Sequence, residues 1–209
     1  MKIKTRVRIK YCGITSQESL DAAVISGADA LGFVLWKGSK RAIDINSLAV
    51  LKIPAFISRV GLFVDQNENF IYNCLPYLDI LQFHGNEPPD ECSKYNKPWI
   101  KALSMHSGID IYEKEKIYAK ASGLLIDTYE KDTPGGTGKT FDWSLVSKNI
   151  KLPLILAGGL NANNVKKAIR IVKPYAVDVS SGVEISLGIK DIKKMMYFYK
   201  SVNNSFNNL

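Results

Sequence analysis

Two side chains capable of acid–base chemistry stand near the ends of apolar runs that are far apart in the chain. Cys12 closes the run RVRIKYC at 6–12, and Asp127 lies next to last in GLLIDT at 123–128. A thiol facing a cleft can act as a base if its pKa is lowered, and a carboxyl group can act as an acid if its pKa is raised. The structural alternatives are a small buried hydrophobe for the cysteine and a helix cap for the aspartate.

A second set of residues has the types that bind phosphate. Adjacent glycines at 158 and 159 allow the backbone to approach an anion closely. The segment SSGVE at 180–184 can open a short helix whose free N–H groups point at a phosphate. Two ordinary left-handed turns are the structural alternative. The candidate ligand-binding residues here are Gly158, Gly159, Asp178, Ser180, Ser181 and Gly182.

A third stretch, DTPGGTGKTFDW at 132–143, contains GGTGKT, which looks like the end of a nucleotide-binding P-loop. A P-loop would need its first glycine at position 133, where this chain has Thr133, and a strand running directly into the loop. The preceding apolar run stops near Asp127. We therefore interpret the stretch as a glycine-rich loop that can close over an anionic ligand.

Short apolar runs rich in β-branched residues alternate with segments of helical character, which is typical of a parallel sheet covered by helices. A TIM barrel needs eight β/α units in a chain of at least about 200 residues. An open Rossmann-like sheet is the competitor, but CGIT stands where G-x-G-x-x-G would follow the first strand. The strand-like runs are 6–12, 30–36, 58–64, 78–84, 99–104, 123–128, 152–158 and 175–181.

We predict the fold class α/β, with a single (β/α)8 TIM-barrel domain over 1–209 and a frayed tail at about 203–209. Helices are predicted at 16–28 with Ser16 as N-cap and at 161–172 with Asn161 as cap. A third helix is predicted at 187–202. Its inward-facing residues would be Ile189, Ile192, Met195, Met196 and Tyr199.

The barrel would bring the candidate chemistry to one face. Active sites of TIM barrels lie at the carboxyl ends of the strands, and phosphate is often bound after strands seven and eight. Cys12 would end strand one and Asp127 strand six, while the glycine pair and SSGVE follow strands seven and eight. Together these positions predict an isomerase of a phosphorylated sugar derivative.

Composition excludes several other classes. The chain of 209 residues has a formal net charge of +8, but its lysines are scattered over the helical segments, which favours solvated faces over a nucleic-acid patch. Three cysteines without C-x-x-C spacing indicate a reduced cytoplasmic protein, and two histidines are too few for a three-histidine zinc site. We expect no signal peptide, since the basic N-terminus lacks an apolar h-region, and no membrane span, since no run of eighteen apolar residues occurs. We predict no metal, no membrane association and no nucleic-acid partner.

Five segments carry a family likeness in order across almost the whole chain. They are KYCGIT at 10–15, LQFHGNE at 81–87, GGTGKTFDW at 135–143, LAGGLNANNV at 156–165 and VDVSSGVE at 177–184. Together they resemble the signatures of phosphoribosylanthranilate isomerase. The resemblance implies an Amadori rearrangement of N-(5′-phosphoribosyl)anthranilate to 1-(o-carboxyphenylamino)-1-deoxyribulose 5-phosphate in tryptophan biosynthesis, without a cofactor.

The resemblance also implies roles for individual residues. Asp127 would protonate the furanose ring oxygen, and Cys12 would remove the proton from C2′. Arg41 would pair with the anthranilate carboxylate, a role suited to a planar bidentate donor. The phosphate would lie between the glycine pair and the Ser180–Gly182 segment, with Asp178 nearby. Gln82 would line the site, and His84 would form a hydrogen bond near the end of its strand. The enzyme would act on a small phosphorylated substrate as a monomer or homodimer.

This mechanism makes an electrostatic demand. At neutral pH, Cys12 must be at least partly thiolate while Asp127 is at least partly protonated. The ordinary pKa values, about 8.5 and 3.9, run the opposite way. We therefore predict a site that lowers the first pKa and raises the second, and a bell-shaped pH dependence of kcat/KM.

Two features leave alternatives open. The family usually has Ser-Pro-Arg where this chain has Ser39-Lys40-Arg41, so the loop that carries Arg41 lacks the stiffening proline. The competing functions are another phosphate-binding barrel, a basic nucleic-acid-binding protein and a barrel that binds ligand without catalysis. An indoleglycerol-phosphate synthase would need a lysine at a strand end, for which Lys101 is a poorly placed candidate. A sugar-phosphate epimerase would need metal ligands.

Overall fold

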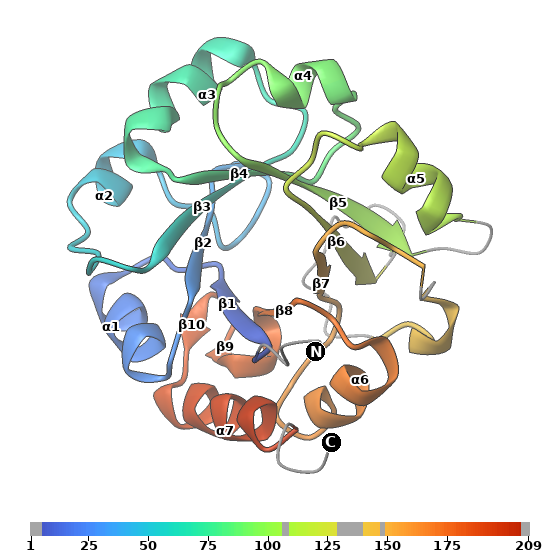
Figure 1. Ribbon diagram of the computed structural model, residues 1–209. Helices are drawn as coiled ribbons and strands as arrows, with labels where there is room; N and C mark the ends of the chain where they lie inside the picture. The colour runs from blue at the N-terminus through green and yellow to red at the C-terminus, as the bar shows by residue number, and fades with distance from the viewer. Residues whose placement is uncertain (1–5, 106–108, 129–139, 147–148, 206–209) are drawn as a thin grey trace.

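The computed structural model describes residues 6–105, 109–128, 140–146 and 149–205. Eight parallel strands close into a barrel, each hydrogen-bonded to the next and the last to the first (Figure 1). The predicted TIM barrel is confirmed, and every predicted run contains a strand. The strands are β1 Arg8–Cys12, β2 Ala30–Val34, β3 Ser58–Phe63, β4 Ile80–Phe83, β5 Trp99–Met105, β6 Gly123–Thr128, β7 Leu154–Leu156 and β8 Ala176–Val179.

Helices surround the ring of strands on its outer side (Figure 1). The α-helices are α1 Gln17–Ile25, α2 Ile45–Ala49, α3 Glu68–Cys74, α4 Pro89–Ser93, α5 Ile111–Ile117, α6 Val165–Val172 and α7 Ile192–Asn203. Short 3₁₀ turns lie at η1 Leu75–Tyr77, η2 Trp143–Leu145 and η3 Ser181–Val183, and a two-stranded hairpin joins β9 Glu184–Ser186 to β10 Ile189–Lys190. No helix among the described residues combines the length and apolar character that a membrane crossing requires.

Side chains that satisfy free backbone groups fix where several helices begin. The Ser16 side chain accepts a hydrogen bond from the Ser19 amide and caps α1, as predicted. Asn161 accepts hydrogen bonds from the amides of Asn163 and Asn164 at 2.9 and 3.2 Å, just before α6. These bonds stabilise the turn at 162–164, and the predicted cap is wrong by three residues, because α6 starts at Val165 with Asn164 as its N-cap.

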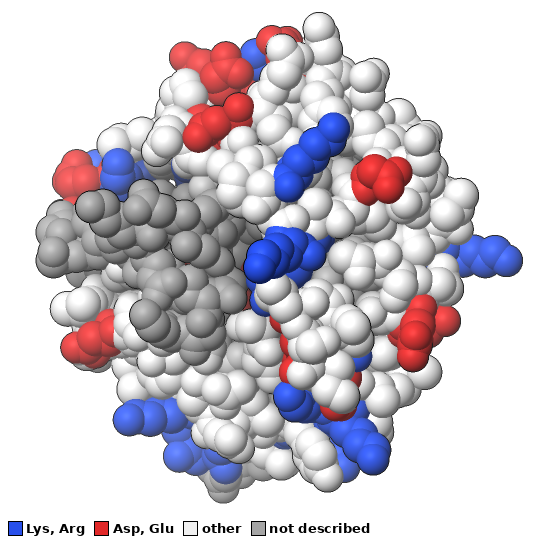
Figure 2. All heavy atoms as spheres, turned by 180° about the vertical axis from the view of Figure 1, so that it is seen from behind, with Lys and Arg blue, Asp and Glu red and all other residues white. Residues whose placement is uncertain are grey.

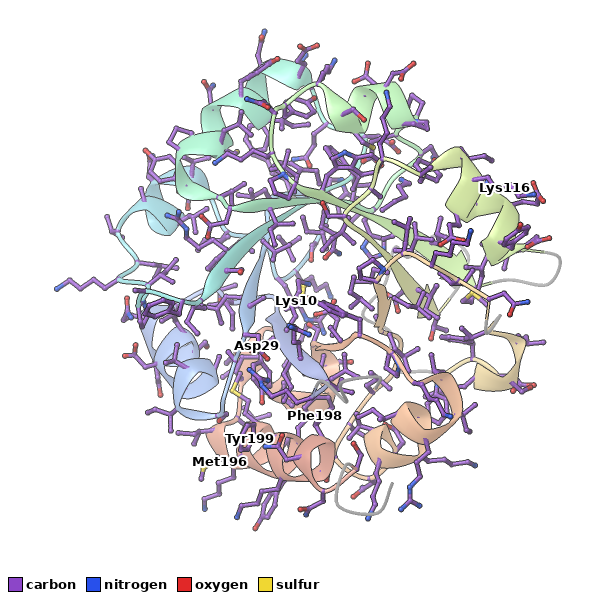
Figure 3. All side chains as sticks on the ribbon, viewed as in Figure 1. Lys10, Asp29, Lys116, Met196, Phe198 and Tyr199 are labelled. Atoms are coloured by element: carbon purple, nitrogen blue, oxygen red, sulfur yellow. The ribbon has the colours of Figure 1, made fainter. Side chains whose placement is uncertain are left out.

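The third predicted helix is wrong at its start and in its buried face. Residues 187–190 belong to the β9–β10 hairpin, and Asp191 caps α7 by accepting from the Lys194 amide. The buried residues are Met195, Phe198 and Val202, whereas Ile189, Ile192, Met196 and Tyr199 are exposed. Figure 3 shows Phe198 on the barrel side of the helix and Met196 on its outer side. The helix runs to Asn203 and Ser205 is buried, while 206–209 lie outside the described residues.

Alternation along the strands separates two apolar regions. A large cluster fills the layer between barrel and helices and includes Tyr11, Phe33, Phe63 and Phe83. Two smaller clusters occupy inward-facing positions of the barrel. One consists of Ile100, Ala102, Leu125, Ile155, Ala157 and Ala176, and the other of Cys12, Val34 and Leu62. The second cluster forms part of the pocket described next.

Candidate active site

One open pocket with about 690 Å³ of space free of protein atoms lies over the ends of the strands. That volume suits a small-molecule site. All of the predicted site residues except Gly182 line it. The polar lining consists of Cys12, Ser39, Arg41, Gln82, His84, Asp127, Asp178, Ser180 and Ser181, and Gly158 and Gly159 complete the backbone wall.

The thiol of Cys12 projects from the end of β1 and is 7% exposed. Its backbone carbonyl accepts a hydrogen bond of 3.0 Å from the Ser180 hydroxyl, which ties β1 to the loop after β8. Burial raises the pKa of this thiol above its ordinary value, while the cations Lys10 and Lys190 lower it. The predicted net lowering is therefore wrong, because the cost of placing a thiolate away from water exceeds the attraction of both lysines.

The carboxyl group of Asp127 lies at the end of β6, two residues after the inward-facing Leu125. Burial is the main cause that raises its pKa to about 6, and the Thr128 amide, at 2.7 Å from Oδ1, opposes that rise. This direction agrees with the prediction for an acid. At neutral pH a useful fraction of Asp127 still carries its proton.

His84 and Gln82 occupy inward-facing positions at the end of β4. The Gln82 side-chain amide lies 3.4 Å from His84 Nδ1, and His84 Nε2 lies 3.7 Å from Asp127 Oδ2. Burial lowers the pKa of His84 to about 4, so the ring is neutral at neutral pH. The predicted hydrogen bond near the strand end involves Gln82, and a neutral ring faces the carboxyl group of Asp127.

Arg41 is held at the rim of the pocket by a residue that sequence reasoning missed. Its Nε and Nη2 donate to the two carboxylate oxygens of Glu184 at 2.7 and 2.8 Å. Lys190 donates to the same carboxylate at 2.8 Å and to the Ser180 carbonyl at 3.2 Å. This bidentate clamp replaces the stiffening that the absent proline would give. It occupies one edge of the guanidinium group and leaves Nη1 as a further donor.

The two predicted phosphate loops touch each other. Gly158 and Gly159 have φ values of +83° and +60°, a region that favours glycine. The predicted short helix is η3, and a Cβ atom on Gly182 would lie 1.9 Å from the Leu160 carbonyl oxygen. Only a residue without a side chain allows this approach. The loops after β7 and β8 therefore form one continuous backbone wall.

A second missed residue, Lys10, lies inside the barrel near the pocket residue Cys12. It stands opposite Asp178 in the β1–β8 register, and its Nζ donates to Asp178 Oδ2 at 3.0 Å. Asp178 Oδ1 is buried and has no hydrogen-bond partner among the described residues. Period-two alternation from the inward-facing Cys12 places Lys10 on the same face of β1, which is the sequence signal that identifies it.

Lys101 is turned away from the pocket. Its Nζ donates to the Gly85 carbonyl at 2.6 Å and to Glu87 Oε2 at 2.8 Å, and it lies 5.6 Å from the centre of the Tyr118 ring. It is thus part of the packing between barrel and helices and is no candidate for a lysine of the synthase type. The predicted lid over 129–140 lies outside the described residues except for Thr140.

Charged side chains of both signs are spread over the face opposite to that of Figure 1 (Figure 2). Basic groups lie near its centre and along its lower edge, and acidic groups lie mostly toward its rim. Among the described residues this face carries no single continuous basic patch. The distribution fits the interpretation of the positive charge as solvated faces.

Comparisons with known proteins show the family to which the chain belongs. The model of the N-(5′-phosphoribosyl)anthranilate isomerase family matches residues 9–201. An N-(5′-phosphoribosyl)anthranilate isomerase from Chromohalobacter salexigens is 54% identical over 202 residues, covering 96% of each chain. The crystal structure of phosphoribosyl anthranilate isomerase from Thermotoga maritima has a TM-score of 0.87 and 38% identity, covering 95% of this chain and 99% of that one.

A further solved isomerase is complexed with reduced 1-(o-carboxyphenylamino)-1-deoxyribulose 5-phosphate. It has a TM-score of 0.84 and 37% identity, covering 95% of this chain and 99% of that one. The match of the family model over most of the chain, together with these relatives, is decisive. The chain belongs to the N-(5′-phosphoribosyl)anthranilate isomerase family.

Proposed function

We propose that this protein converts N-(5′-phosphoribosyl)anthranilate to 1-(o-carboxyphenylamino)-1-deoxyribulose 5-phosphate by acid–base catalysis at the pocket between Cys12 and Asp127. One observation carries the proposal. The thiol and the carboxyl group open into the same pocket, with Arg41 at its rim and the Gly158–Gly159 loop beside it. Such a pocket offers a base, an acid and two separate places for the negative charges of one substrate.

Asp127 acts first as the acid. Its proton passes to the furanose ring oxygen as the C1′–O bond breaks, and the anthranilate nitrogen takes up the developing positive charge as a Schiff base. The pKa of about 6 supports this role, because an ordinary aspartate would hold too little proton at neutral pH. The former ring oxygen remains on C4′ as a hydroxyl group.

Cys12 then acts as the base. Its thiolate removes the proton from C2′, and the electron pair of the C–H bond moves toward the iminium nitrogen, giving an enolamine. The hydroxyl proton at C2′ is lost and C1′ gains a proton, which yields the ketone. The substrate's own nitrogen is the electron sink, so the proposal requires neither metal nor cofactor.

The remaining pocket residues bind the substrate. Arg41 offers Nη1 to the anthranilate carboxylate while Glu184 fixes its orientation. The backbone wall of Gly158, Gly159 and Ser181 receives the phosphate. Asp178 Oδ1, which is buried without a partner in the described part of the chain, accepts a hydrogen bond from a hydroxyl group of the sugar chain. Gln82 and His84 line the floor.

We further propose that the protein is cytoplasmic and works as a monomer or homodimer. Three buried free cysteines fit a reducing compartment. The related isomerase from Thermotoga maritima is described as dimeric. Sedimentation of the purified protein over a range of concentrations distinguishes the two states.

The activity is tested by feeding freshly prepared N-(5′-phosphoribosyl)anthranilate and following the loss of its anthranilate-type fluorescence. The proposal expects rapid enzyme-dependent decay and a product that is a ketose phosphate. Cys12→Ser serves as a control with the same fold and without the base. The absence of decay above the uncatalysed rate at micromolar enzyme would refute the proposed function.

A further inference from the structure

Beside Cys12, inside the barrel, lies a lysine that the acid–base scheme does not use. Lys10 is 5% exposed and stands near the centre of the ring of strands (Figure 3). A buried lysine needs a reason, because removing an ammonium group from water is costly unless it is paired. Asp178 supplies the pairing at 3.0 Å, but a hydrophobic pair of similar size would fill the same space without that cost.

The position of Lys10 relative to the thiol supplies the reason. Gly32 stands opposite Cys12 on β2, and it has no side chain. A Cβ atom there would lie 2.8 Å from Cys12 Sγ and 3.0 Å from Lys10 Cε. The sulfur and the end of the lysine chain therefore share the space beside Gly32. At this short range the positive charge of Lys10 favours the thiolate form of Cys12.

We propose that Lys10 is a positioning residue that favours the reactive thiolate form of Cys12, while Asp178 fixes the ammonium group in place. The proposal rests on the proposed function, in which Cys12 is the base. It assigns the Lys10–Asp178 pair a role in reactivity rather than in holding β1 to β8, which the barrel hydrogen bonds already do.

The other charges around Cys12 come from several elements. Asp178 on β8 disfavours the thiolate, and Lys190 on β10 favours it. Arg41, in the loop after β2, also interacts with it. Arg41 and Lys190 share the carboxylate of Glu184, which offsets part of their charge. Asp127 and His84 line the same pocket from β6 and β4. Among these groups, Lys10 is the cation with the largest effect on the thiol.

The charge state of Lys10 is compatible with this role. Burial lowers the pKa of Lys10, but Asp178 and Cys12 raise it by more, so that it stays above its ordinary value. Lys10 is therefore an ammonium cation at neutral pH, where the thiolate has to form. It stabilises the thiolate without acting as a base itself.

The test is a titration of the Cys12 thiolate by its ultraviolet absorbance in Lys10→Met, with Cys12→Ser as the blank. Burial raises the pKa values of Cys74 and Cys92 to about 12, and their absorbance is subtracted with the blank, which contains both. Loss of an adjacent opposite charge is expected to raise the Cys12 pKa by about 1 to 3 units. An unchanged pKa would overturn the proposal.

A double variant separates electrostatics from folding. Lys10→Met/Asp178→Asn carries no unpaired buried charge and also serves if the single variant does not fold. The proposal expects its Cys12 pKa to lie between those of the wild type and Lys10→Met, because the effect of Lys10 exceeds that of Asp178. A pair that only holds the strands together predicts a wild-type pKa in the double variant. A matched control is Lys101→Met/Glu87→Gln, which removes a buried lysine pair outside the pocket and should not move this pKa.

Kinetics supplies a second reading. Because the Cys12 pKa lies above that of Asp127, the active form, with a thiolate and a protonated acid, is a minor form. Each further unit of difference between the two pKa values lowers the plateau of kcat/KM about tenfold. In the pH profile of Lys10→Met, the alkaline limb of kcat/KM should shift to higher pH by more than the acid limb does. The plateau of kcat/KM should fall about tenfold for each pH unit by which the two limbs move apart. A lower plateau with unmoved limbs would overturn the proposal.

The titration needs no substrate, so its failure is distinct from failure of the proposed function. A wild-type protein that does not isomerise the substrate refutes the function alone. A wild-type protein that does so, combined with an unchanged Cys12 pKa in both Lys10 variants, refutes the role of Lys10 alone.

Discussion

Two buried lysine–carboxylate pairs in this barrel look alike and differ in what they leave unsatisfied. Lys101 and Glu87 lie between barrel and helices, where Lys101 also reaches the Gly85 carbonyl and Glu87 Oε1 accepts from the Asp65 amide. Lys10 and Asp178 lie inside the barrel, where one Asp178 oxygen has no partner among the described residues.

The difference teaches how to tell scaffold from site. Lys101 and Glu87 also form hydrogen bonds with neighbouring backbone groups, which fixes the loop after β4. The inner pair leaves an acceptor facing the pocket and places a cation beside a thiol. A buried ion pair whose hydrogen-bonding groups all have partners indicates a structural role, whereas one with an unpaired acceptor indicates a ligand-binding role.

The largest effect is expected when the thiol of Cys12, which lies beside the Lys10–Asp178 pair, is removed. Cys12→Ser should lower kcat/KM by about 10² to 10⁴, because a serine hydroxyl is a far weaker base than a thiolate. The melting temperature should change little, since the two side chains have similar size. Steady-state kinetics and thermal unfolding of the same preparation measure both. Near-normal turnover would remove Cys12 as the base.

The outer pair should show the reverse pattern. Lys101→Met leaves the Glu87 carboxylate buried without its cation, which should cost about 3 to 5 kcal/mol of unfolding free energy. Urea unfolding measures this loss, and kcat/KM per folded molecule should stay near the wild-type value. The double variant Lys101→Met/Glu87→Gln should recover part of the stability. A large fall in kcat/KM with unchanged stability would contradict the assignment of this pair to the scaffold.

A third, smaller effect concerns the rim. Arg41→Lys keeps the charge but loses the planar donor set, so KM for the natural substrate should rise about tenfold, or about 1.4 kcal/mol. The matched control is the aniline analogue of the substrate, which lacks the carboxylate and should show no such rise. Equal effects on both substrates would mean that Arg41 does not recognise the carboxylate.

Much of this fold was predictable because the alternation of apolar runs and helical segments in the sequence matches the strand and helix order of the barrel. All eight strand-like runs became strands of one barrel, and reading the residue at each strand end placed Cys12, Asp127 and the glycine pair in one pocket. The α7 prediction failed because the apolar residues of the β9–β10 hairpin fit a helical stripe as well as the true buried face of Met195 and Phe198 does. Capping by Asp191 decides the boundary.

The missed residues were hidden for different reasons. Lys10 lies in a basic N-terminal stretch, a composition typical of exposed segments. It precedes Cys12 by two residues in the same strand, and this spacing places both side chains on the inner face of the barrel. Glu184 binds Arg41 across 143 positions of sequence, and no local pattern reveals such a pair. The pKa of Cys12 also depends on burial and on charges from four elements, which only the folded arrangement brings together.

The central claim is that Cys12 and Asp127 are the base and acid of one reaction, and the pH dependence of kcat/KM in the wild-type enzyme tests it most directly. Below about pH 6, where Asp127 is protonated, kcat/KM should rise tenfold per unit as the thiolate forms. It should then level off between the two pKa values. There the dominant form, a thiol with a carboxylate, and the active form, a thiolate with a carboxylic acid, carry the same number of protons. It should fall again above the Cys12 pKa, when both groups have lost their protons. A flat profile across this range, in an enzyme whose rate does not vary with solvent viscosity, would contradict the account.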